Sequence, residues 1–310
     1  MARPLTVAAA QSGPIQKADS RQEVVSRLCA MLEDAADAGV DLMVFTELAL
    51  TTFFPRYYAE NRADMDIWFD KEMPNAATRP LFRLARERGV GFYLGYAELT
   101  PEGQHFNTAI LVDKEGNIAG KYRKVHLPGH DEFDTERAFQ HLEKRYFLPG
   151  DLGFPVWNTM GGNMGMCICN DRRWPETYRC MGLQDVEIIM LGYNTPRHFP
   201  QAPEVDRLQD FHNHLSLQAG AYQNGTWVIG VAKAGVEDGC ELIGQSVIVA
   251  PTGEIVAMTS TMGDEIIVAE CDLDRAARAR KARWNWDYNR EPRHYGIIVD
   301  GPGRPAPADD

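Results

Sequence analysis

Short apolar runs rich in β-branched residues alternate with amphipathic segments along most of this chain. Residues 5–11 (LTVAAAQ) and 41–47 (DLMVFTE) are typical of buried strands, and Glu47 stands at the exit of the second. Between them, residues 21–38 carry apolar side chains at helical spacing and lead to Gly39, a residue that favours a helix C-terminus. Because alternating strands and helices pack as layers, the pattern predicts an α/β architecture.

The rest of the chain continues this alternation with more strands than helices. A helix is expected over residues 79–87, and the runs that follow it, with the turn sequence KEGN, predict a three-stranded meander over residues 90–122. Further strands are expected at residues 163–169, 186–193, 226–235, 246–258 and 264–273, and further helices at 175–181 and 206–224. We therefore expect two mixed β-sheets with helices on their outer faces.

No low-complexity linker interrupts residues 1–296, so we expect a single domain. Residues 297–310 end in a Pro/Gly-rich stretch and are expected to be a tail that is flexible or packed on a neighbouring subunit. Before it, residues 283–296 (RWNWDYNREPRHYG) carry aromatic residues and arginines without clear periodicity. This stretch fits either a surface loop or a clamp between subunits, where Trp, Tyr and Arg are enriched.

The charge balance excludes several classes of partner. Among 310 residues, 44 are acidic and 32 are basic, and the net charge is −12, without a basic stripe that could neutralise a nucleic-acid backbone. No segment has the eighteen or so consecutive apolar residues that a membrane span needs. The N-terminal apolar run is too short for a secretory signal. We expect a cytoplasmic protein that binds neither nucleic acid nor membrane.

The six cysteines lack the density and spacing of a disulfide framework, so most are expected to be reduced core thiols. No second Cys/His pair stands at zinc-ligand spacing, which argues against a metal site.

The sequence CICNDRRWPE, residues 167–176, places two thiols next to charged and amide side chains. If residues 163–169 form a strand, Cys167 and Cys169 share one face, and only Cys169 reaches the strand end, where α/β sheets bind ligands. A helix expected to begin near Pro175 and two arginines would favour the thiolate of Cys169. The alternative is that Cys169 is an inert core thiol, as we expect for Cys167.

A nucleophilic cysteine needs a base for its proton and a cation or donors for the developing oxyanion. Glu47 leaves a buried strand as a carboxylate with little water around it, so it is a candidate general base. Lys124 follows another strand, in GKYRKVHLPGH, and is a candidate cation. Taken singly, each also fits a solvated surface residue.

Three segments around these residues resemble, in order and spacing, the Glu–Lys–Cys motifs of the nitrilase (carbon–nitrogen hydrolase) superfamily: VFTELALTTFFPR, GKYRKVHLPGH and MCICNDRRWPETYR. The resemblance extends from about residue 4 to residue 296. Within the superfamily, the Cys-Asn-Asp-Arg-Arg run is most similar to that of the N-carbamoyl-D-amino acid amidohydrolases, or D-carbamoylases. The family resemblance implies a four-layer αββα sandwich.

By this resemblance, Cys169 is the nucleophile, Glu47 the general base and Lys124 the cation beside the tetrahedral intermediate, while Glu143 matches a second carboxylate near the cysteine. The resemblance places further residues in the substrate pocket: His126, His141, Asn170, Arg172, Arg173, Asn194 and Thr195. Thr46 stands where the family usually has proline, which changes the stiffness of the strand exit and leaves the carboxylate of Glu47 in place.

The implied reaction is hydrolysis of an N-carbamoyl-D-amino acid to the amino acid, carbon dioxide and ammonia through a carbamoyl-cysteine intermediate, without a cofactor, by a homodimer or homotetramer. We expect Arg172 or Arg173 to bind the substrate carboxylate, because arginine binds carboxylates bidentately. Another superfamily member, such as an amidase, a nitrilase or a β-ureidopropionase, is the nearest alternative. Nitrilases, however, typically have Trp-Glu after the cysteine. A non-catalytic redox or binding protein with Cys167 and Cys169 as a thiol pair is a further alternative.

Overall fold

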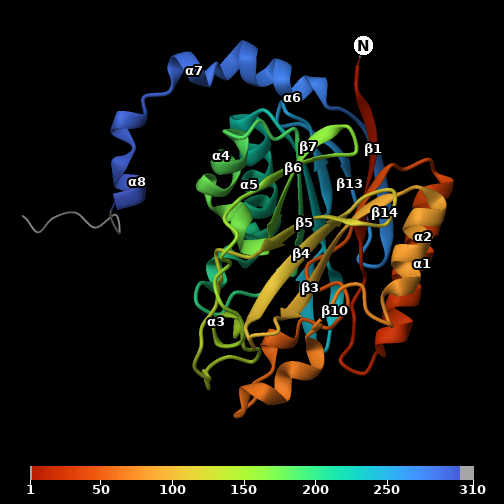
Figure 1. The fold of residues 1–310 in the computed structure, drawn as a ribbon. Coiled ribbons are helices and arrows are strands. Elements are labelled where there is room, and N and C mark those ends of the chain that lie inside the picture. Colours follow the sequence, from red (N-terminus) through yellow and green to blue (C-terminus); the bar gives the residue numbers. More distant parts are fainter. Residues whose placement is uncertain (1, 301–310) are drawn as a thin grey trace, which may run out of the picture.

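The computed structural model describes residues 2–300 of the chain. It contains two six-stranded mixed sheets packed face to face. Figure 1 shows the helices α1 (Arg21–Asp37) and α2 (Arg79–Arg88) on the outside of one sheet and α4 (Pro175–Gly182) and α5 (Gln209–Asn224) on the outside of the other. This four-layer αββα sandwich confirms the fold predicted from the sequence.

The first sheet has the strand order β14-β1-β2-β3-β4-β5. Its strands are β1 (Pro4–Gln11), β2 (Leu42–Val44), β3 (Gly91–Leu99), β4 (His105–Val112), β5 (Ile118–Arg123) and β14 (Glu265–Asp272). β1, β2 and β3 are parallel, whereas β3, β4 and β5 pair antiparallel and form the predicted meander.

The second sheet has the order β13-β12-β9-β8-β7-β6, and its central strands β7, β8 and β9 are parallel. Its strands are β6 (Val156–Thr159), β7 (Gly162–Ile168), β8 (Ile188–Tyr193), β9 (Trp227–Ala232), β12 (Val247–Val249) and β13 (Ile255–Met258). The carboxyl ends of parallel strands meet at one edge of a sheet, which is where such sheets bind ligands. A separate hairpin of β10 (Ala234–Glu237) and β11 (Cys240–Ile243) follows β9.

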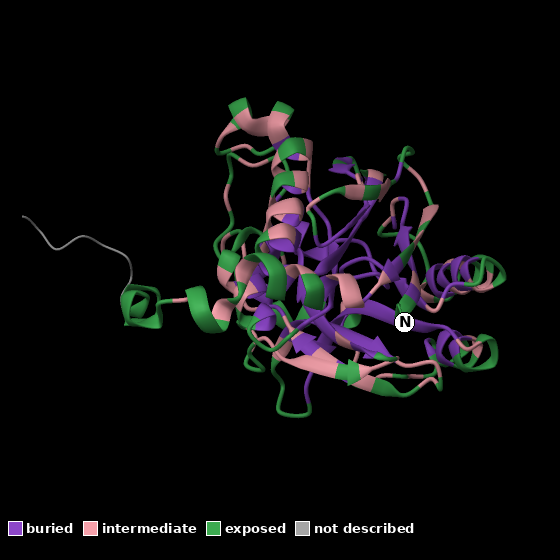
Figure 2. Ribbon diagram, turned by 90° about the horizontal axis from the view of Figure 1, so that it is seen from above, coloured by how far each residue is buried: buried purple, intermediate pink, exposed green. Residues whose placement is uncertain are grey.

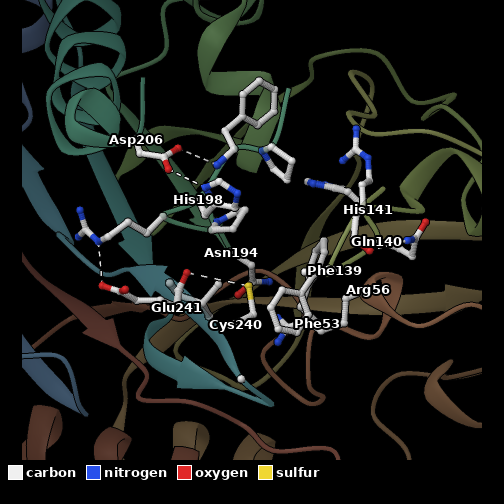
Figure 3. Close-up of a pocket in the computed structure, with 18 of the residues that line it drawn as sticks. Phe53, Arg56, Phe139, Gln140, His141, Asn194, His198, Asp206, Cys240 and Glu241 are labelled. Atoms are coloured by element: carbon white, nitrogen blue, oxygen red, sulfur yellow. Dashed lines mark hydrogen bonds and ion pairs between the residues drawn. The ribbon is translucent and has the colours of Figure 1, made fainter. Parts of the chain in front are cut away.

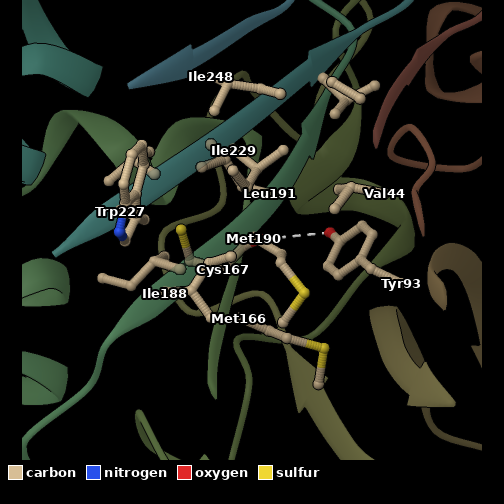
Figure 4. Packing of buried hydrophobic residues seen from close by; sticks show 14 of the residues in the cluster. Val44, Tyr93, Met166, Cys167, Ile188, Met190, Leu191, Trp227, Ile229 and Ile248 are labelled. Atoms are coloured by element: carbon tan, nitrogen blue, oxygen red, sulfur yellow. Dashed lines mark hydrogen bonds between the residues drawn. The ribbon is translucent and has the colours of Figure 1, made fainter. Parts of the chain in front are cut away.

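The main hydrophobic core fills the space between the two sheets and continues across the second sheet to α4 and α5, which contribute Tyr178, Met181, Leu217 and Ala221. Figure 4 shows Met166 and Met190 of the second sheet on the same side as Tyr93 of the first, whereas the sulfur of Cys167 points away from Tyr93. The Tyr93 hydroxyl donates a hydrogen bond to the main-chain oxygen of Cys167 at 3.1 Å and accepts one from the Gly192 amide at 3.2 Å. The Cys167 side chain is fully buried in this core, as expected of a packing residue. A second core lies between the first sheet and its outer helices, and Figure 2 shows the buried residues concentrated in the strands and on the inner helix faces.

Two glycines bring the chain after β2 close to both sheets. A Cβ on Gly192 of β8 would lie 2.1 Å from the main-chain nitrogen of Glu47, and a Cβ on Gly95 of β3 would lie 2.7 Å from the oxygen of Thr46. The missing side chains thus allow the backbone around Glu47 to pass between the sheets.

Two predicted strands end earlier than expected. The strand predicted through Glu47 ends at Val44, and the strand predicted through Cys169 ends at Ile168. Cys169 has φ +48° and begins a short 3₁₀ turn (Cys169–Arg173). The prediction that Cys167 and Cys169 share one face of a strand is therefore wrong, because the left-handed backbone at Cys169 breaks the alternation of the strand.

The segment after β14 is helical rather than irregular. It contains α6 (Asp274–Ala279), a π-helical turn (Arg280–Trp284), α7 (Trp286–Asn289), a 3₁₀ turn (Pro292–His294) and α8 (Gly296–Asp300). Figure 1 shows α7 and α8 as an arm beside α4. The predicted tail begins inside α8, and its residues 301–310 lie outside the described part of the chain.

Within residues 2–300, no helix combines the length and the apolar character that crossing a bilayer requires. Over the same residues, His, Cys, Asp and Glu form no group of three or more suited to holding a metal ion.

Candidate active site

Glu47, Lys124 and Glu143 form a buried charged cluster between the two sheets. Glu47 follows β2, Lys124 follows β5, and Glu143 is the first residue of the short helix α3 (Glu143–Tyr146). Lys124 Nζ donates to Glu47 Oε1 at 2.8 Å and to Glu143 Oε2 at 2.6 Å, and all three side chains are fully buried. The structure thus brings together the three charged residues that the sequence predicted, with one lysine between two carboxylates.

The charges of this cluster are set by mutual interaction. Burial alone would lower the pKa of Lys124, but the neighbouring Cys169, Glu143 and Glu47 raise it above its usual value. Burial would likewise raise the pKa of Glu143, but Lys124 and a 3.0 Å hydrogen bond from His141 lower it. Lys124 is therefore a cation and Glu143 an anion at neutral pH.

Glu47 is held by donors to both carboxylate oxygens. Oε1 accepts a second hydrogen bond, from Asn107 Nδ2 at 2.8 Å, and Oε2 accepts one from the main-chain amide of Asn194 at 3.0 Å. Asn194 Nδ2 also donates to the main-chain oxygen of Glu47 at 3.0 Å. These bonds fix the carboxylate in one orientation, as a group that exchanges protons with a neighbour requires.

The thiol of Cys169 is buried beside this cluster, and burial followed by the charge of Glu47 raises its pKa to about 11. Lys124 and Arg172 act in the opposite direction and do not outweigh burial. Arg172 thus favours the thiolate, as expected, but its effect is smaller than that of burial and the thiol pKa is raised. A protonated thiol needs a base, and the buried carboxylate of Glu47 can accept its proton.

Arg172 supports the turn that carries Cys169. It is fully buried, and its Nη1 donates to the main-chain oxygen of Cys169 at 2.7 Å. Nε donates to Asn213 Oδ1 at 3.0 Å and Nη2 to Thr195 Oγ1 at 2.9 Å, while the guanidinium lies 4.3 Å from the ring centre of Tyr193. Arg172 was predicted to line the pocket, but its donors are directed at the protein.

Asp171 joins the Cys169 turn to the loop after Lys124. Its Oδ2 accepts from Tyr122 Oη at 2.7 Å and from the Ile168 amide at 3.0 Å, and its Oδ1 accepts from the amide and Nδ1 of His126 at 2.9 and 2.8 Å. The His126 ring is stacked on Trp174. His126 was predicted to line the pocket, but it lies outside the cavity lining and instead orders the loop that follows Lys124.

A cavity of about 580 Å³ opens directly onto Cys169, and we call it the catalytic cavity. The predicted pocket residues His141, Asn170, Arg173, Asn194 and Thr195 line it. Among the described lining residues, two are arginines and none is Asp or Glu. This cavity is therefore suited to a small molecule that carries a negative charge.

Arg173 is the exposed arginine of this cavity. Within residues 2–300, its side chain donates one long hydrogen bond, from Nη1 to the amide oxygen Asn170 Oδ1 at 3.4 Å. The charge of Arg172, followed by partial loss of water around the residue, lowers the pKa of Arg173 to about 10. Arg173 is still cationic at neutral pH and can bind an anionic group of a ligand.

A second cavity of about 560 Å³ adjoins the first, and we call it the distal cavity. The two cavities share five lining residues, namely Arg137, His141, Asn194, Pro196 and Phe199. Figure 3 shows the distal cavity, with His198 and Asp206 across it from Phe53 and Cys240. The contribution of the β10–β11 hairpin to this cavity was not predicted from the sequence.

The family model described as carbon-nitrogen hydrolase matches residues 6–281. An N-carbamoylputrescine amidase from Solanum lycopersicum is 28% identical over 310 residues, with 96% of this chain and 95% of the relative covered. A nitrilase from Pyrococcus abyssi is 30% identical over 243 residues (78% and 81% covered), and a citrullinase from Francisella tularensis is 27% identical over 289 residues (91% and 94% covered).

Among solved structures, a carbon-nitrogen hydrolase from Helicobacter pylori superposes with a TM-score of 0.83 at 27% identity, covering 96% of this chain and 99% of its own. The comparisons confirm the expected superfamily. Two of the curated relatives are named N-carbamoylputrescine amidases, so the comparisons support the superfamily but not the finer resemblance to D-carbamoylases, which concerns the substrate.

Proposed function

The chain belongs to the carbon–nitrogen hydrolase family, and from that premise we propose that it hydrolyses the ureido carbon–nitrogen bond of an N-carbamoyl amino acid, in the D configuration. The observation that carries this proposal is the lining of the catalytic cavity. A buried thiol lies at one side of it and a cationic Arg173 at another, and no carboxylate is among the described lining residues.

The reaction begins with the protonated thiol. Glu47 accepts the proton of Cys169, and the sulfur attacks the carbamoyl carbon, so that the carbonyl oxygen becomes an oxyanion. The ammonium group of Lys124 and a main-chain amide stabilise this oxyanion. Glu143 bonds to the same lysine and keeps it charged and in place.

Breakdown of the tetrahedral intermediate breaks the bond to the amino acid nitrogen. Glu47 returns its proton to that nitrogen, the free amino acid leaves, and a carbamoyl thioester remains on Cys169. Glu47 then takes a proton from water as the water oxygen attacks the thioester carbon, and it returns this proton to the departing sulfur, which restores the thiol and the carboxylate. The product carbamate decomposes to carbon dioxide and ammonia.

Two lines of support point to a ureido substrate. An N-carbamoylputrescine amidase and a citrullinase, both similar to this chain over more than 90% of its length, are named after substrates with a ureido group. The cavity indicates the charge at the far end of the molecule, because the guanidinium of Arg173, which has no carboxylate partner within residues 2–300, attracts a carboxylate and repels an ammonium group. The D configuration is carried only by the resemblance of the Cys-Asn-Asp-Arg-Arg run.

N-carbamoylputrescine is the second candidate substrate, favoured by the names of the relatives. Its far end is an ammonium group, which would lie in a cavity lined by Arg137 and Arg173. Such a substrate would need an anion, whereas the acidic residues of the adjoining cavity, Asp206 and Glu241, are already paired with His198 and Arg197. We therefore place an N-carbamoyl amino acid first.

Ammonia release from matched N-carbamoyl-D- and N-carbamoyl-L-amino acids and from N-carbamoylputrescine tests the proposal, with the Cys169→Ala variant as control. Turnover confined to the D acids and abolished in the variant is the expected result. Faster turnover of N-carbamoylputrescine would replace the acid with the amine as substrate. Hydrolysis of simple amides alone would reject a ureido substrate and leave the family assignment intact.

We also propose that the chain forms a homodimer or homotetramer in which the C-terminal arm contacts a neighbour. Tyr288, Ile297 and Val299 on this arm are 83%, 71% and 85% exposed, which is unusual for large apolar side chains on one segment. Sedimentation velocity of the full chain and of a form that ends at Arg283 measures the assembly directly. If both forms assemble with the same number of subunits, the arm is not part of the interface.

A further inference from the structure

The distal cavity is an extension of the catalytic cavity rather than a separate site. Five residues line both cavities, and they include His141 and Asn194, which bond to the buried carboxylates Glu143 and Glu47. Cys169 and Arg173 line only the catalytic cavity. A ligand whose reacting group and carboxylate occupy the catalytic cavity therefore has space for a third substituent beyond His141 and Asn194.

The ionic side chains that line the distal cavity are largely occupied by protein partners. Arg56 bonds to Glu237 at 2.9 Å, Arg137 to Asp134 at 2.9 Å, and Arg197 to Glu241 at 2.9 Å. His198 lies 2.6 Å from Asp206. Arg207 makes no side-chain hydrogen bond or ion pair within residues 2–300, and it is exposed to solvent. Since the other charges are paired and Arg207 is exposed to solvent, a charged substituent inside this cavity would lose its water without gaining a buried partner.

Apart from Gln140, His141 and Asn194, the remaining surface of the distal cavity is largely apolar and aromatic. Phe53 and Phe139 line only this cavity, and Phe199 lines both, together with Pro196, Pro200 and Leu242. Phe139 comes from the loop before α3, while Leu242 comes from β11. Aromatic rings at the walls of a cavity favour a flat or bulky apolar group, which they can contact by stacking or edge-to-face packing.

We infer that the distal cavity binds the side chain of the substrate and selects large uncharged side chains, above all aromatic ones. This inference rests on the proposed function and adds the class of amino acid to it. The carbamoyl group then lies at Cys169, the carboxylate at Arg173, and the side chain against Phe53 and Phe139.

The test compares kcat/KM for N-carbamoyl-D-amino acids whose side chains are aromatic, small or charged: phenylalanine, alanine, aspartate and lysine. The same series is measured on Phe139→Ala, on Phe139→Leu, and on Phe133→Ala as the matched control. Phe133 belongs to the same loop, is 52% exposed and lies outside both cavity linings. Phe139 is itself 39% exposed, so its replacement leaves the fold intact.

We expect the phenylalanine derivative to be the best substrate and the two charged ones the poorest. Phe139→Ala should reduce the phenylalanine-to-alanine ratio of kcat/KM by about tenfold, and Phe139→Leu should restore part of it. Phe133→Ala should leave the ratio unchanged. Equal turnover of all four substrates, with a ratio that Phe139→Ala does not change, would overturn the inference while the proposed function stands. Failure to hydrolyse any of the four would overturn both.

Discussion

Nη1 of Arg172 donates a 2.7 Å hydrogen bond to the main-chain oxygen of Cys169. Cys169 has a left-handed backbone with φ +48°, a conformation that is unfavourable for a residue with a side chain. The contact therefore stabilises a strained turn that directs the thiol away from the strand and toward Lys124 and Glu47. The two consecutive arginines therefore have different roles, because Arg172 bonds to the protein and Arg173 lines the cavity.

The variant Arg172→Lys should lose turnover with little change in KM. Lysine has no planar group that can reach Cys169, Thr195 and Asn213 together, so buried acceptors lose their donor. Each unsatisfied buried group costs about 1–3 kcal/mol, so we expect a lower free energy of unfolding as well. Urea unfolding and steady-state kinetics measure the two effects. A large rise in KM at unchanged kcat would instead identify Arg172 as a substrate ligand.

The variant Arg173→Lys should have the opposite signature. Because Arg173 is exposed and bonded only weakly to Asn170, its replacement should leave the unfolding free energy unchanged. Lysine retains the charge but not the bidentate geometry, so KM for an N-carbamoyl amino acid should rise by about tenfold while kcat changes little. An uncharged N-carbamoyl amine serves as control substrate and should show no such rise. Equal KM values for the acid in both proteins would reject carboxylate binding by Arg173.

The sequence was sufficient to predict the layers of the fold. In the segments β1, α1 and β3 to β5, apolar residues recur at clear strand or helix spacing. The structure has strands and a helix at these positions. The ends of β2 and β7 were predicted too late, since their positions depend on contacts from distant segments. Gly192 of β8 is one example, because the absence of its side chain gives Glu47 its place between the sheets.

The charged cluster of the site was predicted from the family resemblance, but the residues that hold it were mostly not. Asn107 is a polar residue within the apolar run of β4, and that exception to the strand pattern could have identified it as a partner of a buried charge. The role of Asp171 was not predicted, because local sequence does not reveal its bonds to Tyr122 and His126. The β10–β11 hairpin reaches the distal cavity only through tertiary packing.

The reactivity of Cys169 should follow its raised pKa of about 11. Since only the thiolate is alkylated, the rate of modification by a small neutral reagent should continue to increase above pH 8.5, the usual thiol pKa, without a plateau up to pH 10. Cys180 is exposed, so the experiment uses a Cys180→Ser background and follows the Cys169 peptide by mass spectrometry. Glu47→Gln should shift the curve to lower pH, because the carboxylate charge helps to raise the thiol pKa. A plateau below pH 8.5 in the Cys180→Ser protein would contradict the buried, protonated thiol.

The variant Glu143→Gln should be destabilised at neutral pH and less so in acid. Removing one charge from a buried ion pair costs about 3–5 kcal/mol. Burial would raise the folded-state pKa of Glu143, but Lys124 outweighs burial and the pKa is lowered. The ionised carboxylate therefore contributes its full stabilisation above the unfolded-state pKa of about 4.3, and this stabilisation is lost as pH falls through the folded-state pKa. The difference in unfolding free energy between the two proteins should therefore shrink below about pH 4. Exposed Glu132→Gln is the control, and a difference independent of pH would argue against an ionised Glu143.

The variant Asp171→Asn should uncouple the Cys169 turn from the loop after Lys124. The carboxylate accepts four hydrogen bonds, and an amide in its place presents a donor to at least one of Tyr122, Ile168 or His126. An unmatched buried donor costs about 1–3 kcal/mol, and the loosened turn should reduce kcat more than it affects KM. Asp151→Asn is the matched control, since Asp151 is paired with Arg123 but is 53% exposed, and its stability should change by less than about 0.5 kcal/mol. Unchanged kcat in Asp171→Asn, with unfolding equal to that of Asp151→Asn, would show that the thiol and the lysine are positioned independently of each other.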